Sequence, residues 1–285
     1  MDATVLIPTF DHGLTLRWAV TSALAQTLED VEVLVVGDGV PDVTRKLMAD
    51  LCAADARVRF FDNPKGPRHG ELHRHAALQE ARGRIVAYLS DDDLWFRDHL
   101  EVMATALHGT DFAGAFLVKA HRDGTLTPRL SDLRQSWYLR HAAGGRRSMS
   151  LSAAAHTLDL YRRLPHGWRT TPEAQRTDAH MWRQMLTVRN VRVVSATWPT
   201  VLAFGSTARG DMTMAEREAE LAGWWTRLAD PGMARALRDR IAGLTVRSAA
   251  AYAADNAKLR DEVESLRGRY RRAKARNASR SSDAG

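Results

Sequence analysis

Strand and helix signals alternate through the first third of the chain, and this alternation restricts the possible folds more than any other feature. Short apolar runs typical of strands occupy residues 3–7, 31–36, 58–61 and 85–89. Between them, apolar side chains recur at helical spacing in 14–25, 43–54 and 71–81. Such alternation predicts an α/β fold, with a sheet of mostly parallel strands that is flanked by helices.

Polar residues and glycines follow each of these predicted strands. The first strand runs into Asp11, the second into Gly37, Asp38 and Gly39, and the fourth into the segment 90–93. In open α/β sheets, ligands bind in the crevice beyond the carboxyl ends of the strands. We therefore expect a binding site where these segments meet.

The rest of the chain predicts further helices at 97–107 and 178–186 and further strands at 112–118 and 191–196. The segment 121–145 is polar and rich in Arg, and we expect irregular loops there. From residue 214 onward the pattern is helical. The expected organisation is a domain at 1–210, a helical extension at 211–277 and a disordered tail at 278–285.

Apolar and polar residues near the C-terminus are spaced by four and three positions, as in a heptad repeat. The predicted seam consists of Tyr252, Asn256, Leu259, Val263, Leu266 and Tyr270. A polar Asn at one seam position is typical of a dimeric coiled coil, which would make the protein a homodimer. The alternative is a helix that packs on its own domain.

Charge is concentrated in the same region. Residues 257–285 carry nine Lys and Arg against four acids, a net charge of +5 out of +7 for the whole chain. The body is nearly balanced, so we expect no nucleic-acid partner, whereas the basic tail is compatible with peripheral contact at a membrane. The single cysteine, Cys52, excludes an internal disulfide. No apolar run can span a bilayer and no signal peptide is evident, which favours a cytoplasmic location.

Three consecutive carboxylates, at Asp91, Asp92 and Asp93, follow the fourth predicted strand. Adjacent carboxylates repel each other unless a cation or water compensates their charge. Mg²⁺ and Mn²⁺ prefer oxygen ligands and can bridge to the oxygens of a diphosphate. The alternative is a solvated turn in which Asp93 caps the next helix.

Five segments of this sequence, in consistent order and spacing, resemble the motifs of the family 2 glycosyltransferases. They are Ile7-Pro8-Thr9-Phe10-Asp11, Ser22-Ala23-Leu24-Ala25-Gln26-Thr27, Val35-Val36-Gly37-Asp38-Gly39-Val40, His73-Arg74-His75 with Ala81-Arg82-Gly83, and Ser90-Asp91-Asp92-Asp93. The resemblance covers residues 3–100 and, with fewer matching positions, 150–205. It implies a GT-A fold, in which a Rossmann-like mixed sheet binds a nucleotide-diphosphate sugar.

The resemblance also implies roles for individual residues. Asp38 would bind the nucleobase or ribose, and Arg74 the region of the diphosphate. The residues expected to line the donor pocket beside them are Pro8, Thr9, Asp11 and Asp91. Asp92 and Asp93 would hold Mn²⁺ or Mg²⁺. The alternatives are a tight-turn Asp at 38, a surface Arg at 74 and a helix N-cap at Asp11.

In the second region of resemblance, Asp178 lies where the family has its catalytic base. It would take the proton of the acceptor hydroxyl, although an Asp at the start of a helix is also common. His180 is an alternative base. Trp168 is either a platform for an acceptor sugar or a core residue. The Arg-rich stretch 134–147 could bind an acceptor that carries phosphate, or be a solvated loop.

Together these observations predict an inverting glycosyltransferase, assisted by a metal, that moves a sugar from a nucleotide-diphosphate donor to the hydroxyl of an acceptor whose identity the sequence leaves open. Three positions depart from the family pattern, because Gly37, Ser90 and Thr177 stand where acids are usual. The alternatives are therefore a catalytically inactive sugar-nucleotide-binding or scaffold protein, and a nucleotidyltransferase.

Overall fold

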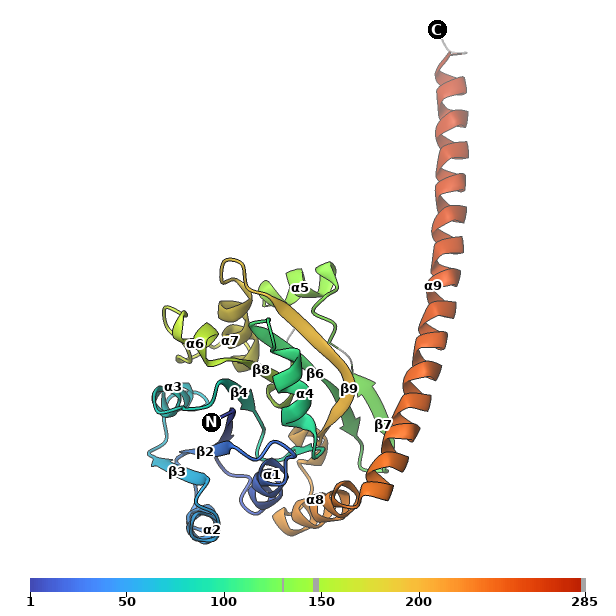
Figure 1. Ribbon diagram of the computed structural model, residues 1–285. Helices are drawn as coiled ribbons and strands as arrows, with labels where there is room; N and C mark the ends of the chain where they lie inside the picture. Colours follow the sequence, from blue (N-terminus) through green and yellow to red (C-terminus); the bar gives the residue numbers. More distant parts are fainter. Residues whose placement is uncertain (130, 146–148, 283–285) are drawn as a thin grey trace. The chain divides into compact units, whose positions relative to one another are not determined.

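The computed structural model describes residues 1–129, 131–145 and 149–282, with the side chains of 251–252, 254–257, 259 and 270–282 left aside. The chain forms two compact units, residues 1–238 and 239–285 (Figure 1). The first unit contains the sheet and the candidate site. The second consists of the later part of one long helix.

One mixed sheet forms the centre of the first unit. Within the described residues its strands are β1 (Ala3–Thr9), β2 (Val31–Asp38), β3 (Val58–Asn63), β4 (Ile85–Tyr88), β5 (Leu94–Trp95), β6 (Phe112–Ala120), β7 (Leu126–Arg129), β8 (Ala154–Thr157) and β9 (Val193–Ala203). Their order is β3-β2-β1-β4-β8-β6-β9-β5, and β7 pairs with β6. The first four strands in this order are parallel, and β8 is antiparallel to both of its neighbours.

Helices flank this sheet. In the first unit they are α1 (Thr15–Leu24), α2 (Asp42–Ala54), α3 (Glu71–Gln79), α4 (His99–Ala106), α5 (Ser136–Ala143), α6 (Leu158–Arg162), α7 (Thr177–Leu186) and α8 (Met214–Ala229), with short 3₁₀ turns at Leu151–Ala153 and Ser206–Arg209. Helix α9 (Pro231–Ser282) begins in this unit and forms the second. Helix α1 contacts β1 and β2, α3 contacts β2, and α4 contacts β6 and β9. The predicted mixed α/β architecture is confirmed.

The core is continuous because the central strands are buried along their length. All eight residues of β2 and six of the seven in β1 are buried. Strands covered on both faces need unbroken apolar runs, and these two strands supply them. Their polar residues lie near the strand ends: Thr4 donates to Glu32 at 2.8 Å near the amino ends, and Thr9 and Asp38 stand at the carboxyl ends, where the chain leaves the sheet.

The prediction of irregular loops throughout 121–145 is wrong. The chain turns back after β6 through a tight turn that contains Asp123 and Gly124, with Gly124 at a φ of +76°. Strand β7 then pairs antiparallel with β6, and α5 follows. An Asp-Gly pair is a strong hairpin signal, and the polar composition of the segment obscured it.

Helix α8 belongs to the first unit, although the sequence placed it in a separate extension that begins at residue 211. It contacts α1. Buried Arg209 links it to the sheet, because its guanidinium donates to Glu220 on α8 at 2.6 Å and to the carbonyl of Ala120 at 3.0 Å. These contacts cross the domain boundary that the sequence suggested between residues 210 and 211.

Helix α9 continues through Ser282, whereas the sequence predicted a disordered tail from residue 278. Residues 283–285 lie outside the described residues. Of the predicted seam, the side chains of Tyr252, Asn256, Leu259 and Tyr270 also lie outside them, and Val263 and Leu266 are exposed. In the part of the chain that the structure describes, no helix combines the length and the apolar character needed to cross a bilayer.

A buried imidazole sits between α4 and β9. His99 stacks on Trp95 with ring centroids 4.0 Å apart, and its Nδ1 lies 2.9 Å from Thr200 Oγ1. Burial lowers the pKa of His99 from 6.5 to about 3. The folded protein therefore holds this ring neutral at pH values where the unfolded chain would protonate it.

This pKa predicts acid sensitivity. Since the unfolded state binds the extra proton between about pH 6.5 and 3, acidification favours unfolding by about 1.4 kcal/mol per pH unit in that window. His99→Phe keeps the stacked ring but cannot titrate, so its free energy of unfolding should fall less steeply with pH by that amount. Urea unfolding of both proteins at several pH values measures the two slopes. Equal slopes would contradict a neutral buried His99.

Candidate functional site

A cavity of about 620 Å³ opens at the carboxyl ends of the parallel strands. The residues predicted from sequence that line it are Pro8, Thr9, Asp11, Asp38, Arg74, Asp91, Asp92 and Asp178. Segments far apart in the sequence thus meet at one place, as the topology of an open sheet dictates. The volume lies within the usual range for small-molecule sites. Asp11 precedes the N-cap of α1, which is Leu14, so the N-cap alternative does not apply.

Asp38 ends β2 and fixes the loop that follows β3. Its Oδ2 accepts from Lys65 Nζ at 2.7 Å, and its Oδ1 accepts from the backbone N–H of Gly66 at 2.6 Å. Gly70 adopts a φ of +68°, and a Cβ there would lie 2.6 Å from Asp38 Cγ. Only glycine therefore lets the loop approach this carboxylate so closely. Asp38 both lines the cavity and holds one of its walls.

Two buried polar atoms at the cavity have no partner within the described protein. They are the hydroxyl Oγ1 of Thr9 and Nε of Arg74. Arg74 is buried, its guanidinium carbon lies 4.9 Å above the ring of Trp168, and its Nη2 donates to the carbonyl of His69. Buried polar groups normally have hydrogen-bond partners, so a polar ligand in the cavity would satisfy both atoms. The alternative of a surface arginine is wrong for Arg74.

Trp168 is a core residue, and the sugar-platform alternative is wrong. Its side chain is 1% exposed. Its ring Nε1 donates to the hydroxyl of Tyr88, and its edge packs against Trp182 with centroids 5.7 Å apart. No face of the ring is free for a ligand, because Arg74 lies over it. Trp168 contributes to the site by supporting Arg74.

Asp178 lies in the first turn of α7 and faces the cavity. Burial raises the pKa of this carboxyl, and the charges of Arg74 and Arg176 oppose that rise. Thr177 beside it donates to the carboxylate of Glu71 at 3.4 Å. His180, the alternative base, does not line the cavity. Its Nδ1 lies 2.9 Å from the amide oxygen of Gln175.

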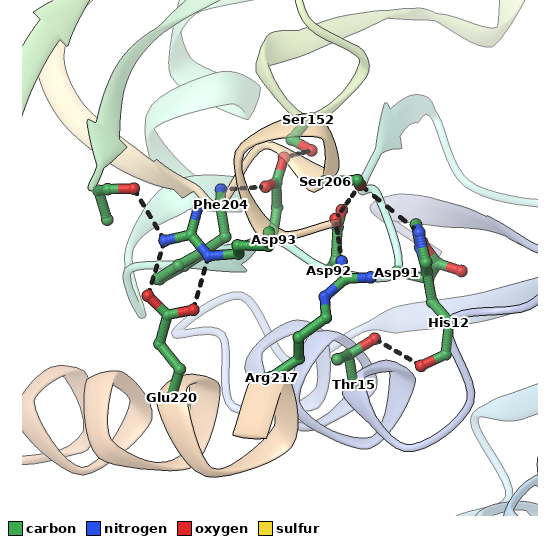
Figure 2. Close-up of polar contacts among 12 residues, drawn as sticks. His12, Thr15, Asp91, Asp92, Asp93, Ser152, Phe204, Ser206, Arg217 and Glu220 are labelled. Carbon is green, nitrogen blue, oxygen red and sulfur yellow. Dashed lines mark hydrogen bonds and ion pairs between the residues drawn. The ribbon is translucent and has the colours of Figure 1, made fainter. Parts of the chain in front are cut away.

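The acidic turn after β4 is compensated by residues from three other parts of the chain (Figure 2). Asp91 Oδ1 lies 2.6 Å from Nδ1 of His12, which follows β1. Burial disfavours a charged imidazole, but the hydrogen bond and charge of Asp91 outweigh it and raise the pKa of His12 to about 9. The imidazole of His12 is therefore a cation at neutral pH.

Asp92 has two partners from the C-terminal part of the first unit. Its Oδ2 accepts from Ser206 Oγ at 2.6 Å and from Arg217 Nη2 at 2.9 Å. Burial and the charge of Asp91 raise the pKa of Asp92, while His12, Ser206 and Arg217 act in the opposite direction. Arg217 comes from α8, more than a hundred residues later in the chain.

Asp93, predicted as a metal ligand, has both carboxylate oxygens engaged by neutral donors of the protein and lies outside the candidate cation group. Its Oδ2 accepts from Ser152 Oγ at 2.5 Å, and its Oδ1 accepts from the backbone N–H of Phe204 at 2.8 Å. Figure 2 shows the side chain directed toward these two donors and away from His12. Burial and the charge of Asp92 raise the pKa of Asp93 to about 7. Asp93 therefore ties the turn to the segment before β8 and the segment after β9, and it does not cap α4.

A candidate cation group remains, formed by His12, Asp91 and Asp92. Each offers one ligand atom, and these atoms lie within 4.8 Å of one another. Two carboxylate oxygens and an imidazole nitrogen suit Mn²⁺ or Mg²⁺ in chemical type. The donor set thus fits a divalent ion, with His12 in the place that the sequence assigned to Asp93.

Sequence reasoning missed several residues of the site. His12, Lys65, Glu71, Ser206 and Arg217 were not singled out, although each contacts a predicted site residue or its neighbour. His12 could have been found, because it follows Asp11 at a strand end. Arg217 and Ser206 carry no local signal, since only the folding of α8 onto α1 brings them to the acidic turn.

Comparison with known sequences gives one family. The profile of glycosyl transferase family 2 matches residues 4–166. An Escherichia coli UDP-Glc:α-D-GlcNAc-diphosphoundecaprenol β-1,3-glucosyltransferase is 29% identical over 106 residues, which are 36% of this chain and 40% of that protein. The matched segment spans less than half the length of each curated relative compared.

Two solved structures show the same fold. Residues 1–349 of Staphylococcus aureus TarS, in complex with UDP-GlcNAc, align with a TM-score of 0.57 at 16% identity over 72% of this chain and 59% of that chain. The mannosyltransferase PcManGT from Pyrobaculum calidifontis, in complex with GDP-Man and Mn²⁺, aligns with a TM-score of 0.50 at 17% identity over 70% of this chain and 56% of that chain. At these identities the likeness concerns the fold.

The different partners of Asp92 and Asp93 predict opposite behaviour on substitution. Asp93→Asn leaves one of two buried donors unsatisfied and should lower the free energy of unfolding by about 1–3 kcal/mol. It should still be stabilised by Mn²⁺ with a nucleoside diphosphate. Asp92→Asn retains an acceptor for Ser206 and Arg217 but should lose that stabilisation. Thermal unfolding with and without the ligands measures both effects, and a loss of the Mn²⁺ response only in Asp93→Asn would reverse the assignment.

Proposed function

Because this chain belongs to glycosyl transferase family 2, we propose that it is an enzyme that transfers a sugar from a nucleotide-diphosphate donor to an acceptor hydroxyl, with inversion at the anomeric carbon. The observation that carries the proposal is the set of side chains that line the cavity. A candidate cation group, a buried guanidinium at Arg74 and a carboxylate at Asp178 all line or border the same space. Binding of a diphosphate and removal of a proton need these three kinds of group.

The donor would lie along the carboxyl ends of β1 and β2. The nucleoside would contact Thr9 and Asp38, whose oxygens can accept from a base N–H or a ribose hydroxyl. Arg74 would bind near the diphosphate, which satisfies its unpartnered Nε. The ligands UDP-GlcNAc and GDP-Man in the two solved relatives support a nucleotide-sugar donor and leave the base open.

His12, Asp91 and Asp92 would hold the divalent ion. A bound Mn²⁺ or Mg²⁺ supplies positive charge that stabilises the leaving diphosphate. The Mn²⁺ complex of the P. calidifontis enzyme supports this part of the proposal. His12 Nδ1 lies 2.6 Å from Asp91, and the imidazole would have to lose its proton as the ion binds, because only the neutral ring can serve as a ligand.

Asp178 is the proposed base. The acceptor oxygen forms a bond to the anomeric carbon while the bond from that carbon to the diphosphate oxygen breaks, and Asp178 accepts the hydroxyl proton. Its raised pKa makes the carboxylate a better proton acceptor than an exposed Asp. Thr177 and Glu71 tie the start of α7 to α3, which carries Arg74, and so fix the distance between base and donor.

The proposed activity can be tested with UDP- and GDP-sugars and Mn²⁺, by following release of nucleoside diphosphate with a panel of hydroxyl acceptors. Release that depends on donor, metal and acceptor supports the transferase, and an inverted anomer in the product supports the stereochemistry. Binding without turnover would instead favour the inactive binding protein. Pyrophosphate release from a nucleoside triphosphate and a sugar phosphate would favour a nucleotidyltransferase.

The role of Asp178 predicts a selective loss. Asp178→Asn keeps the size of the side chain but cannot take a proton, so the transfer rate should fall by roughly a hundredfold to ten-thousandfold. Donor and metal affinity, measured by calorimetry, should change little. Asp159→Asn is a matched control, because Asp159 lies in the first turn of α6 and is exposed. Full transfer activity in Asp178→Asn would place the base elsewhere.

The position of Asp38 predicts a loss of donor binding. Asp38→Ala removes a charged acceptor and the anchor of the loop at Lys65, and should weaken nucleotide affinity about tenfold to a hundredfold. Asp42→Ala serves as control, because this exposed carboxylate pairs with Arg45 outside the cavity. If Asp38→Ala binds nucleotide as tightly as the wild type, Asp38 has a structural role in the turn and no role in donor binding.

A further inference from the structure

The guanidinium of Arg217 places a positive charge beside Asp92, one of the two carboxylates that would bind the proposed cation. The residue is 8% exposed, and its Nη2 donates to Asp92 Oδ2 at 2.9 Å. Figure 2 shows the side chain extending from α8 to Asp92. A guanidinium and a divalent ion cannot both neutralise one buried carboxylate at close range without repelling each other.

The rest of α8 holds this guanidinium in place. The helix contacts α1, and Glu220, one turn after Arg217, pairs with the buried Arg209 at 2.6 Å. The position of Arg217 therefore follows from the docking of a whole helix. An exposed side chain in an arbitrary rotamer would not be held in place by such contacts.

The pairing with Asp92 leaves donor capacity in Arg217 unused. Nε of Arg217 is buried and has no partner within the described protein. Asp92 Oδ2 is shared with Ser206, so the carboxylate does not engage the guanidinium in a bidentate manner. Arg217 does not itself line the cavity, but its partner Asp92 does, and the planar N–H groups of a guanidinium match the geometry of phosphate oxygens.

We propose that Arg217 is an internal counter-cation that occupies Asp92 in the free protein, yields it to the divalent ion, and then binds the diphosphate of the donor. This inference rests on the proposed function, since it requires a cation and a diphosphate at this site. It makes the two ligands depend on each other. The ion alone must displace Arg217 with no new partner for it, whereas the diphosphate supplies that partner.

The coupling can be measured without any turnover. The probe is Mn²⁺, titrated into the full-length protein and followed by the electron paramagnetic resonance signal of the free ion, with and without saturating UDP or GDP. Arg217→Met removes the competing charge, so it should bind Mn²⁺ alone more tightly than the wild type by roughly tenfold to a hundredfold, within the usual range of coupling between two ligands. The gain in Mn²⁺ affinity on adding nucleotide should shrink correspondingly.

Two further variants keep the test decisive. Arg217→Gln retains an N–H donor for Asp92 and therefore protects the fold, while it loses the charge, so the same gain in Mn²⁺ affinity is expected. Arg227→Met is the matched control, because Arg227 lies on the same helix, is exposed and packs over Trp224. Its Mn²⁺ affinity should equal that of the wild type.

The outcomes separate this inference from the proposed function. If the wild type binds Mn²⁺ with nucleotide present, and neither Arg217 variant binds Mn²⁺ alone more tightly than the wild type, the counter-cation role is overturned while the metal site stands. If the wild type binds no Mn²⁺ with either nucleotide, the metal-assisted function fails and this inference fails with it. An increase in Arg227→Met equal to that in Arg217→Met would also overturn the specific role of Arg217.

Discussion

Three consecutive carboxylates are buried at the end of β4, and their mutual repulsion has to be compensated by other groups of the protein. Each receives a different partner: His12 for Asp91, Arg217 for Asp92, and Ser152 with Phe204 for Asp93. Breaking a buried ion pair by removing one partner typically costs about 3–5 kcal/mol. The positions of the loop after β1, of the segment before β8, of the segment after β9, and of α8 thus all depend on this one turn.

The three carboxylates consequently differ in what they can do. Asp93 is fully engaged by neutral donors, so it fastens the turn to the sheet. Asp91 and Asp92 are held by cationic side chains, those of His12 and Arg217. A site that stays neutralised before its ligand arrives avoids an open cluster of buried negative charge. A cation that bound there would have to compete with these positively charged side chains for the carboxylates.

The alternation of strand and helix was sufficient to predict the parallel half of the sheet and its ligand-binding edge, because both follow from short-range patterns. The resemblance to the family 2 glycosyltransferases, rather than the alternation, assigned Asp38, Arg74 and Asp178 to one site, and all three line the cavity. Sequence reasoning could not resolve the adjacent acids at 91–93, since their roles depend on which way each side chain leaves the turn. It also missed Arg217, which reaches Asp92 only after α8 has docked, and it read the hairpin of β7 as a loop because of its polar composition.

The docking of α8 has a consequence for biosynthesis. A chain leaving the ribosome exposes its N-terminal part first, so β1 to β4 and the acidic turn emerge before Ser206 and Arg217 exist outside the exit tunnel. Until then Asp92 lacks its guanidinium, and the nascent sheet carries an uncompensated charge at its edge. The final packing of the first unit must therefore wait for translation to pass α8. Completion of the cavity is a late event in the synthesis of the polypeptide, although most of the residues that line it are among the earliest to be made.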